Sequence, residues 1–248
     1  MEYWRDQGIV LSARAHGENG AVVSLLTEGC GRHAGYVHGG QGSAKRAMLQ
    51  PGVSVGAEWS SRLSENMGTY KLEQDGAPDA GILLDPLKLG ALMSACALCD
   101  SALPERESHP ALFYGLQALI AALDGEHWAP AYVMWEIAFL KELGFALDLT
   151  RCAGGGDPAT LTHVSPKSGR AVSAAQAAPY KEKLLDLPHF LRPSGGGGEG
   201  EDILTGLKMT GYFLEHWAFN HHTKGVPEPR LRFQERFEKS LGPKDICS

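Results

Sequence analysis

The sequence predicts a mixed α+β protein of more than one domain, with a small β-barrel first and α-helices after it. Residues 1–80 hold short apolar or alternating segments separated by Gly, Pro and Asn clusters, a pattern typical of a barrel. After about residue 82, apolar residues recur at helical spacing instead. The 248 residues are enough for two buried cores, so we expect domains at 1–80 and 81–248.

The expected barrel has five strands, and its connections differ in length. The longest connection covers residues 39–52. The strands are expected at residues 8–14, 21–26, 35–38, 53–59 and 69–73.

The helical part begins at a clear signal, because Asp85 is a good N-cap and Pro86 suits the first helical position. Gly144 is a stop signal for a later helix. Short polar turns join these segments, which favours a bundle. After the first helix, the others are expected at residues 110–123, 130–143, 203–220 and 229–241.

One segment interrupts the helices. Residues 148–179 are rich in Gly, Ser and Pro and poor in large apolar side chains, so we expect an irregular insertion there. The glycines of residues 194–200 predict a flexible loop.

The net charge of −6 argues against a nucleic-acid binder on average, but the charge is unevenly distributed. No carboxylate occurs between Glu28 and Glu58, whereas three of the cations and two histidines lie there. The acidic excess lies instead in residues 81–223. A local basic surface on the barrel is therefore compatible with an acidic chain.

The start of the chain lacks the basic and apolar segments of a signal peptide, and no apolar stretch is long enough to span a bilayer. The five cysteines are odd in number and scattered, which fits reduced thiols in a cytoplasm. We expect no membrane association.

Two candidate metal or redox motifs have simpler explanations. Cys96 and Cys99 form a C-x-x-C pair deep within an expected helix, on its apolar face, and are interpreted as structural. His216 and His221 are five residues apart, which is not the spacing of helical metal ligands. Nucleophile-elbow, phosphate-loop and dinucleotide motifs are missing from the sequence, so an enzyme is not expected.

Cations and aromatic rings alternate through the barrel segments, a combination suited to single-stranded nucleic acid. Tyr36 and Trp59 fit a buried core equally well, with the cations merely solvating the barrel. The candidate DNA-binding residues are Arg14, Arg32, His33, Tyr36, His38, Lys45, Arg46, Arg62 and Lys71.

A series of motifs resembles one bacterial family over nearly the whole chain. In the first part these are W-R-D-x-G-I-V-L from Trp4, H-G-E-N from His16, L-T-E-x-x-G-R from Leu26, G-x-V-x-G from Gly35 and L-Q-P-G from Leu49. Later ones are W-E-x-x-F-L-x-x-L-G-F from Trp135, L-D-L-x-x-C from Leu147 and V-S-P-K-S-G from Val164. In this order the motifs resemble those of the RecO family of recombination mediators.

The resemblance implies an N-terminal OB-fold barrel, a helical bundle and a zinc-finger-like insertion. It also implies a cytoplasmic, nucleoid-associated bacterial protein that acts in repair and recombination without a cofactor. Such proteins bind single- and double-stranded DNA, anneal complementary strands, pair with RecR and contact the acidic C-terminal tail of the single-strand-binding protein. Together these activities load a recombinase on coated DNA.

The chain departs from the family in its metal ligands and in its basic loop. Only Cys152 matches one of the family's four zinc cysteines, and one thiolate cannot hold a tetrahedral zinc, so we expect an insertion without metal. The loop after Gly39 holds only Lys45 and Arg46 where relatives are denser in cations. DNA affinity is therefore expected to be modest and salt-sensitive.

A third departure concerns the acidic tail, since Met134 stands where relatives commonly have an Arg. The alternative to a DNA-binding mediator is a protein-interaction scaffold with weak DNA binding. The candidate partner-binding residues are Phe113, Leu116, Val133, Met134 and Lys141.

Overall fold

The computed structural model describes residues 2–63 and 66–242. The chain forms two compact units, which we call the first and second unit. The first unit comprises Met1–Asp124 with Pro227–Arg230, and the second comprises Gly125–Val226 with Leu231–Ser248. The predicted division at residue 80 marks instead the change from strands to helices inside the first unit, and its status as a domain boundary stays a prediction.

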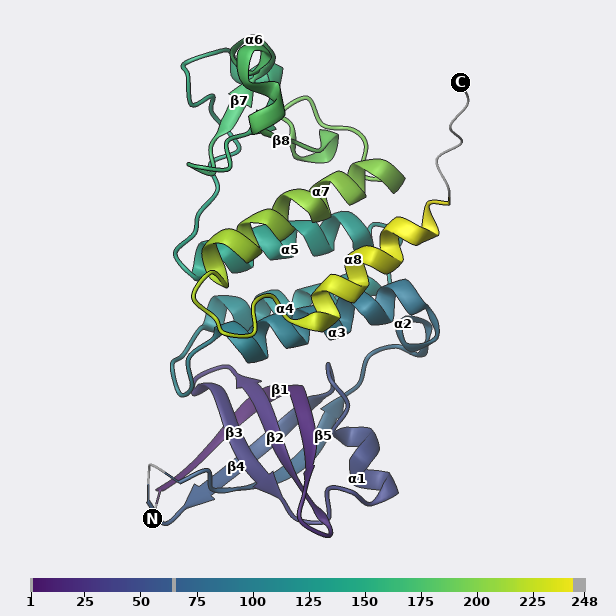
Figure 1. The fold of residues 1–248 in the computed structure, drawn as a ribbon. Coiled ribbons are helices and arrows are strands. Elements are labelled where there is room, and N and C mark those ends of the chain that lie inside the picture. Colours follow the sequence, from purple (N-terminus) through teal and green to yellow (C-terminus); the bar gives the residue numbers. More distant parts are fainter. Residues whose placement is uncertain (1, 64–65, 243–248) are drawn as a thin grey trace. The chain divides into compact units, whose positions relative to one another are not determined.

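The first unit begins with five strands that close into a barrel in the order β1-β2-β3-β5-β4 (Figure 1). Pairing is antiparallel except between β3 and β5, which are parallel. This arrangement agrees with the predicted OB-fold barrel. The strands are β1 (Glu2–His16), β2 (Gly20–Thr27), β3 (Gly31–Val37), β4 (Ser54–Ser61) and β5 (Thr69–Gly76).

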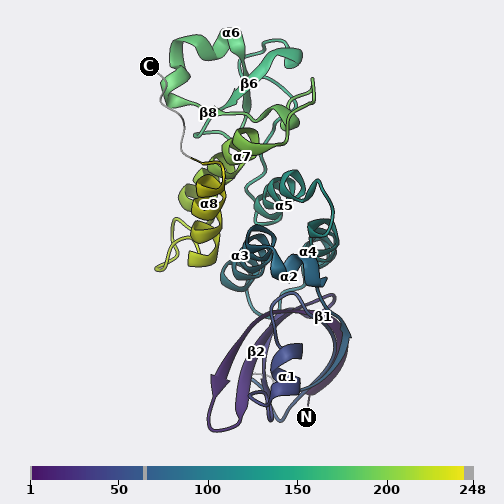
Figure 2. The same cartoon turned by 90° about the vertical axis from the view of Figure 1, so that its right-hand side faces the viewer.

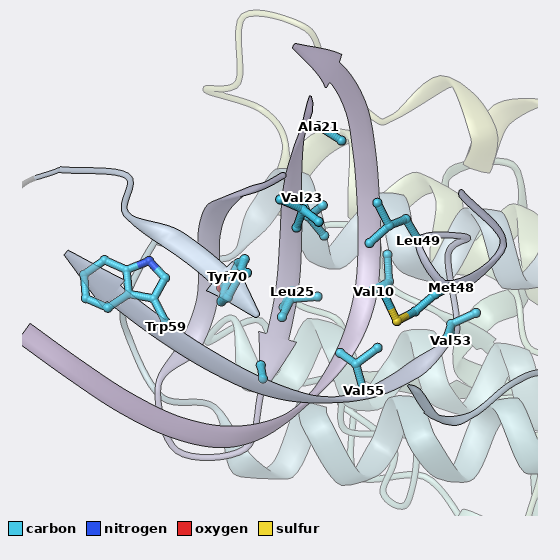
Figure 3. Packing of buried hydrophobic residues seen from close by; sticks show 12 residues of the cluster. Val10, Ala21, Val23, Leu25, Met48, Leu49, Val53, Val55, Trp59 and Tyr70 are labelled. Atoms are coloured by element: carbon cyan, nitrogen blue, oxygen red, sulfur yellow. The ribbon is translucent and has the colours of Figure 1, made fainter. Parts of the chain in front are cut away.

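The barrel core follows from alternation along the strands. In β3 and β4 every second residue is buried, because successive side chains of a strand point to opposite faces. Figure 3 shows the buried side chains converging inside the curved sheet. The labelled members are Val10, Ala21, Val23, Leu25, Met48, Leu49, Val53, Val55, Trp59 and Tyr70.

The long connection between β3 and β4 contains a short helix, α1 (Ser43–Met48), where the sequence predicts only a loop. Met48 and the following Leu49 are buried and belong to the barrel core. These two side chains hold the connection against the barrel, and they leave Lys45 and Arg46 exposed to solvent.

Three helices follow the barrel in the first unit: α2 (Ala80–Leu84), α3 (Pro86–Ala102) and α4 (Pro110–Leu123). As predicted, Asp85 caps α3, where its carboxylate accepts hydrogen bonds from the N–H groups of Leu87 and Lys88. Helix α3 packs against β1, β2 and α4 (Figure 2). Cys96 and Cys99 are buried on α3, as predicted.

The second unit contains helix α5 (Trp128–Glu142), which packs against helix α7 (Gly200–Phe213). The predicted helix at 203–220 is in fact α7 followed by a π-helical turn, η4 (Leu214–Ala218). Helix α8 covers Glu228–Ser240. Within the second unit, the buried carboxylate of Glu136 accepts hydrogen bonds from Tyr132 (2.8 Å) and Thr210 (2.5 Å).

The insertion predicted at residues 148–179 is more regular than expected, because its strands β6 and β7 form a sheet with β8, which follows it, in the order β7-β6-β8. Small and medium apolar side chains of β6 and β7 are buried, so a small core forms without large residues. The elements of the insertion and of the segment after it are η1 (Pro158–Thr160), β6 (Leu161–Val164), β7 (Ala171–Ser173), α6 (Ala174–Ala177), η2 (Ala178–Lys183), β8 (Leu185–Asp186) and η3 (His189–Leu191).

None of the helices in residues 2–63 and 66–242 is long and apolar enough to cross a membrane.

Candidate nucleic-acid interface

The strand register places two of the predicted DNA-binding residues in one row on the outside of the barrel. Arg14 pairs with Val22, Val22 pairs with Tyr36, and Tyr36 pairs with Thr69 of β5. Directly paired residues point to the same face of a sheet. Arg14 is exposed and Tyr36 is half-buried, so this row is on the outer face.

The next row holds two histidines on either side of a glycine. His16 pairs with Gly20, and His38 follows one step beyond the Ala21–Val37 pair. A Cβ atom on Gly20 would lie 1.9 Å from the Tyr36 hydroxyl, so the phenol end of Tyr36 covers this glycine. The Tyr36 ring centroid is 6.0 Å from that of His16 and 4.8 Å from that of His38.

The adjoining loops are held together by hydrogen bonds. The Gln41 amide donates to the carbonyl oxygens of Gly17 and Gly20, at 3.0 Å each, and thereby joins the segment after β3 to the β1–β2 turn. The Lys45 ammonium donates to the His38 carbonyl at 2.6 Å. The segment that carries the two exposed cations of α1 is therefore anchored beside Tyr36.

The side chain of Arg32 is held by contacts with other residues of the first unit. Its Nε donates to the Leu103 carbonyl at 2.7 Å, and its Nη1 is 3.4 Å from Glu105 and 3.8 Å from Asp100. The Asp100 carboxylate also accepts a hydrogen bond from Ser12. Arg32 thus connects β3 to the end of α3, and its guanidinium is engaged by carboxylates rather than directed at a ligand.

His33 and Trp59 are buried in the barrel. The His33 ring centroid is 4.8 Å from that of Trp59 and 5.1 Å from that of Trp4. Burial lowers the pKa of His33, which favours the neutral imidazole inside the barrel. Of the two rings for which sequence left core and surface open, Trp59 is core, whereas Tyr36 lies on the outer face.

Lys71 and Arg62 lie outside the Tyr36 row. Lys71 is exposed on β5, two residues after Thr69, but it pairs with Glu58, which forms an ion pair with Arg5. Arg62 is exposed just after β4. Arg14 and Tyr36 share the row, and His38, Lys45 and Arg46 adjoin it through the Tyr36–His38 ring contact and the hydrogen bond from Lys45 to the His38 carbonyl.

Sequence reasoning missed His16 and Gln41. Alternation could have found His16, because it lies two residues after Arg14 and therefore on the same face of β1. Gln41 carried no signal, since its role depends on two carbonyl groups in a distant turn.

Within the described residues, no group of three or more His, Cys, Asp and Glu side chains could hold a metal ion. Burial raises the pKa of the Cys152 thiol, but hydrogen bonds from Ser173 and from the backbone of Gly154 and Gly156 lower it by more. The pKa is therefore lowered to about 7. The metal content of the insertion stays a prediction.

The predicted partner-binding residues come from both units. Phe113 and Leu116 are buried on α4 of the first unit. On α5 of the second unit, Val133 is buried whereas Met134 and Lys141 are exposed. Their common pocket stays a prediction.

Comparison with known proteins identifies the family. The model described as recombination protein O N terminal matches residues 1–74, and that described as recombination protein O C terminal matches residues 83–223. The chain belongs to the RecO family. It is similar to the DNA repair protein RecO of Rhodospirillum centenum, with 52% identity over 239 residues that cover 96% of this chain and 95% of the relative.

Other RecO proteins are similar over equally long stretches. The DNA repair protein RecO of Phenylobacterium zucineum is 42% identical over 97% of this chain and 99% of its own length. The DNA repair protein RecO of a Ruegeria species is 44% identical over 96% of this chain and 99% of its own length. The RecO resemblance stated from the motifs is confirmed, and the chain is a DNA repair protein of this family.

Proposed function

We propose that this RecO protein is a recombination mediator whose barrel binds single- and double-stranded DNA. The observation that supports this most strongly is the outer surface of β1, β2 and β3. It presents Tyr36 beside His38, with Arg14 in the same row and Lys45 and Arg46 on the adjoining helix. Cations that follow phosphates and a ring available to bases are the features single-strand binding needs.

The proposal leaves out Arg32 and His33 as direct DNA contacts. The Arg32 guanidinium is engaged by Asp100 and Glu105, and the His33 ring is enclosed by other rings. Lys71 and Arg62 would contact DNA only beyond the central row. The small number of remaining cations supports modest affinity with a shallow salt slope, about −0.7 per neutralised phosphate on single strands.

The remaining steps of the proposal rest on the family. The protein would anneal complementary strands, pair with RecR and bind the acidic tail of the single-strand-binding protein, and so help to load a recombinase. The exposed Lys141 and Met134 are the residues of α5 that we propose for the tail. No cofactor and no bond-making chemistry are part of this function.

The test of DNA binding is a titration of a fluorescent single-stranded oligonucleotide, at low and high salt, with the wild type and with Lys45→Glu/Arg46→Glu. The variant should bind more weakly, and the salt slope should fall by about 0.7 in log–log units for each lost phosphate contact. Unchanged binding at low salt would remove α1 from the interface.

The alternative is a protein-interaction scaffold with weak DNA binding, which the acidic net charge favours. An annealing assay with two complementary oligonucleotides, with and without the single-strand-binding protein, separates the two functions. Annealing supports the mediator. Intact partner binding without annealing supports the scaffold.

A further inference from the structure

The Tyr36 ring lies over a position of the sheet, Gly20, that has no side chain. Its own row contains Val22 and Arg14, but its phenol end reaches over Gly20 in the next row, between His16 and His38. Gly20 is buried although it lies on the row that bears two exposed histidines. The glycine therefore provides the space in which the ring lies.

The two histidines border the ring without stacking flat on it. The plane of Tyr36 makes an angle of 80° with that of His16 and 86° with that of His38. Parallel stacking is the geometry that a nucleobase uses on an aromatic side chain. Neither imidazole adopts that geometry toward Tyr36.

The surroundings of the ring suit a nucleotide. Arg14 lies two strands away in the same row, about 10 Å from Tyr36 at the usual strand spacing, and can reach a phosphate. The neighbouring β1–β2 turn carries one carboxylate, that of Glu18, and residues 29–57 carry none. The Gln41 hydrogen bonds hold this turn beside the ring.

We infer that Tyr36, seated over Gly20 and bordered by His16 and His38, stacks on one unpaired base and gives the barrel a preference for single-stranded over duplex DNA. The inference rests on the proposed function, because it assumes that this face binds DNA. The faces of paired bases are covered by their neighbours in a duplex, so only an unpaired base can use the ring. The cations contact both forms of DNA alike.

Two variants separate the ring from its surroundings. Tyr36→Leu keeps an apolar cover over Gly20 but removes the aromatic face, whereas Tyr36→Phe keeps that face. Stacking contributes roughly 5- to 150-fold in affinity per base, so Tyr36→Leu should lose this factor on a thymidine oligonucleotide. Tyr36→Phe should bind like the wild type, and both should bind duplex within about twofold of it.

A third variant moves the ring without altering it. Gly20→Ala places a methyl group where the phenol end lies and should weaken single-strand binding while removing no ring and no charge. Gly56→Ala is its matched control, since a Cβ on this strand glycine meets only the Glu73 carbonyl, at 4.0 Å. The control should bind normally.

An abasic strand tests the same inference by removing the bases from the ligand. The wild type should bind an abasic strand more weakly than a thymidine strand of equal length, and Tyr36→Leu should bind the two almost equally. The Tyr36→Leu loss should also be the same at low and high salt, because stacking is not screened.

The outcomes separate the two proposals. If the wild type does not bind single strands, both are overturned. If it does bind, but Tyr36→Leu matches it on the thymidine strand, the inference about Tyr36 is wrong and the proposed function stands.

Discussion

Replacement of Arg32 by Gln should destabilise the first unit and leave the DNA affinity of the folded protein unchanged. Sequence reasoning places this residue in the DNA interface, whereas the structure shows it joining β3 to the end of α3. The two roles predict opposite results for one substitution.

The magnitude follows from the contacts that are lost. The hydrogen bond from the Arg32 Nε to the Leu103 carbonyl is 2.7 Å long, and a bond of this charged kind contributes about 1.5–3 kcal/mol. The pairs with Asp100 and Glu105 are longer and add about 0–1 kcal/mol. A loss of about 2–3 kcal/mol corresponds to a roughly 30- to 150-fold larger unfolding constant.

The assay is urea unfolding combined with hydrogen exchange of the β3 peptide, which reports on the first unit. Arg46→Gln is the matched control, because it removes the same charge from an exposed position of α1. The control should change stability by no more than about 0.5 kcal/mol and should weaken DNA binding. A normal unfolding midpoint with reduced DNA affinity for Arg32→Gln would refute the structural role.

Three further predictions concern ionisable groups. Asp202→Asn should speed hydrogen exchange of residues 187–198 and cost about 2 kcal/mol, because the carboxylate accepts the N–H groups of His189 and Gly198; unaltered exchange would contradict this. Burial lowers the pKa of His33, so the unfolded chain takes up a proton first as the pH falls below about 6.5. Stability should then fall by at most about 1.4 kcal/mol per pH unit relative to His33→Gln, and parallel pH profiles would exclude the effect. With its pKa lowered to about 7, Cys152 should be alkylated rapidly at neutral pH, whereas Cys96, whose pKa burial raises to about 12, should react only after unfolding; peptide mapping would show the reverse order if this is wrong.

Strands and long helices could be predicted because their hydrophobic periods repeat along the sequence. Helix α1 could not, since its six residues are held by Met48 and Leu49 through tertiary burial rather than by their own pattern. The same reason explains the sheet of the insertion, whose core consists of a few small side chains.

The candidate site shows a different limit. Composition selects Arg32 and Arg46 alike, because both are cations in a stretch without carboxylates. Only the fold brings Asp100 and Glu105 from a later helix and loop to Arg32. Spacing along the sequence cannot show which distant residues will pair with a given charge.

The first unit includes Pro227–Arg230 as well as the first half of the chain. A ribosome makes a chain from its N-terminus, so the barrel and α2–α4 are complete long before this last segment emerges. Synthesis must pass through Gly125–Val226, the larger part of the second unit, before the first can acquire its final residues. The barrel can therefore begin folding early, but the unit around it matures only when the chain is nearly finished.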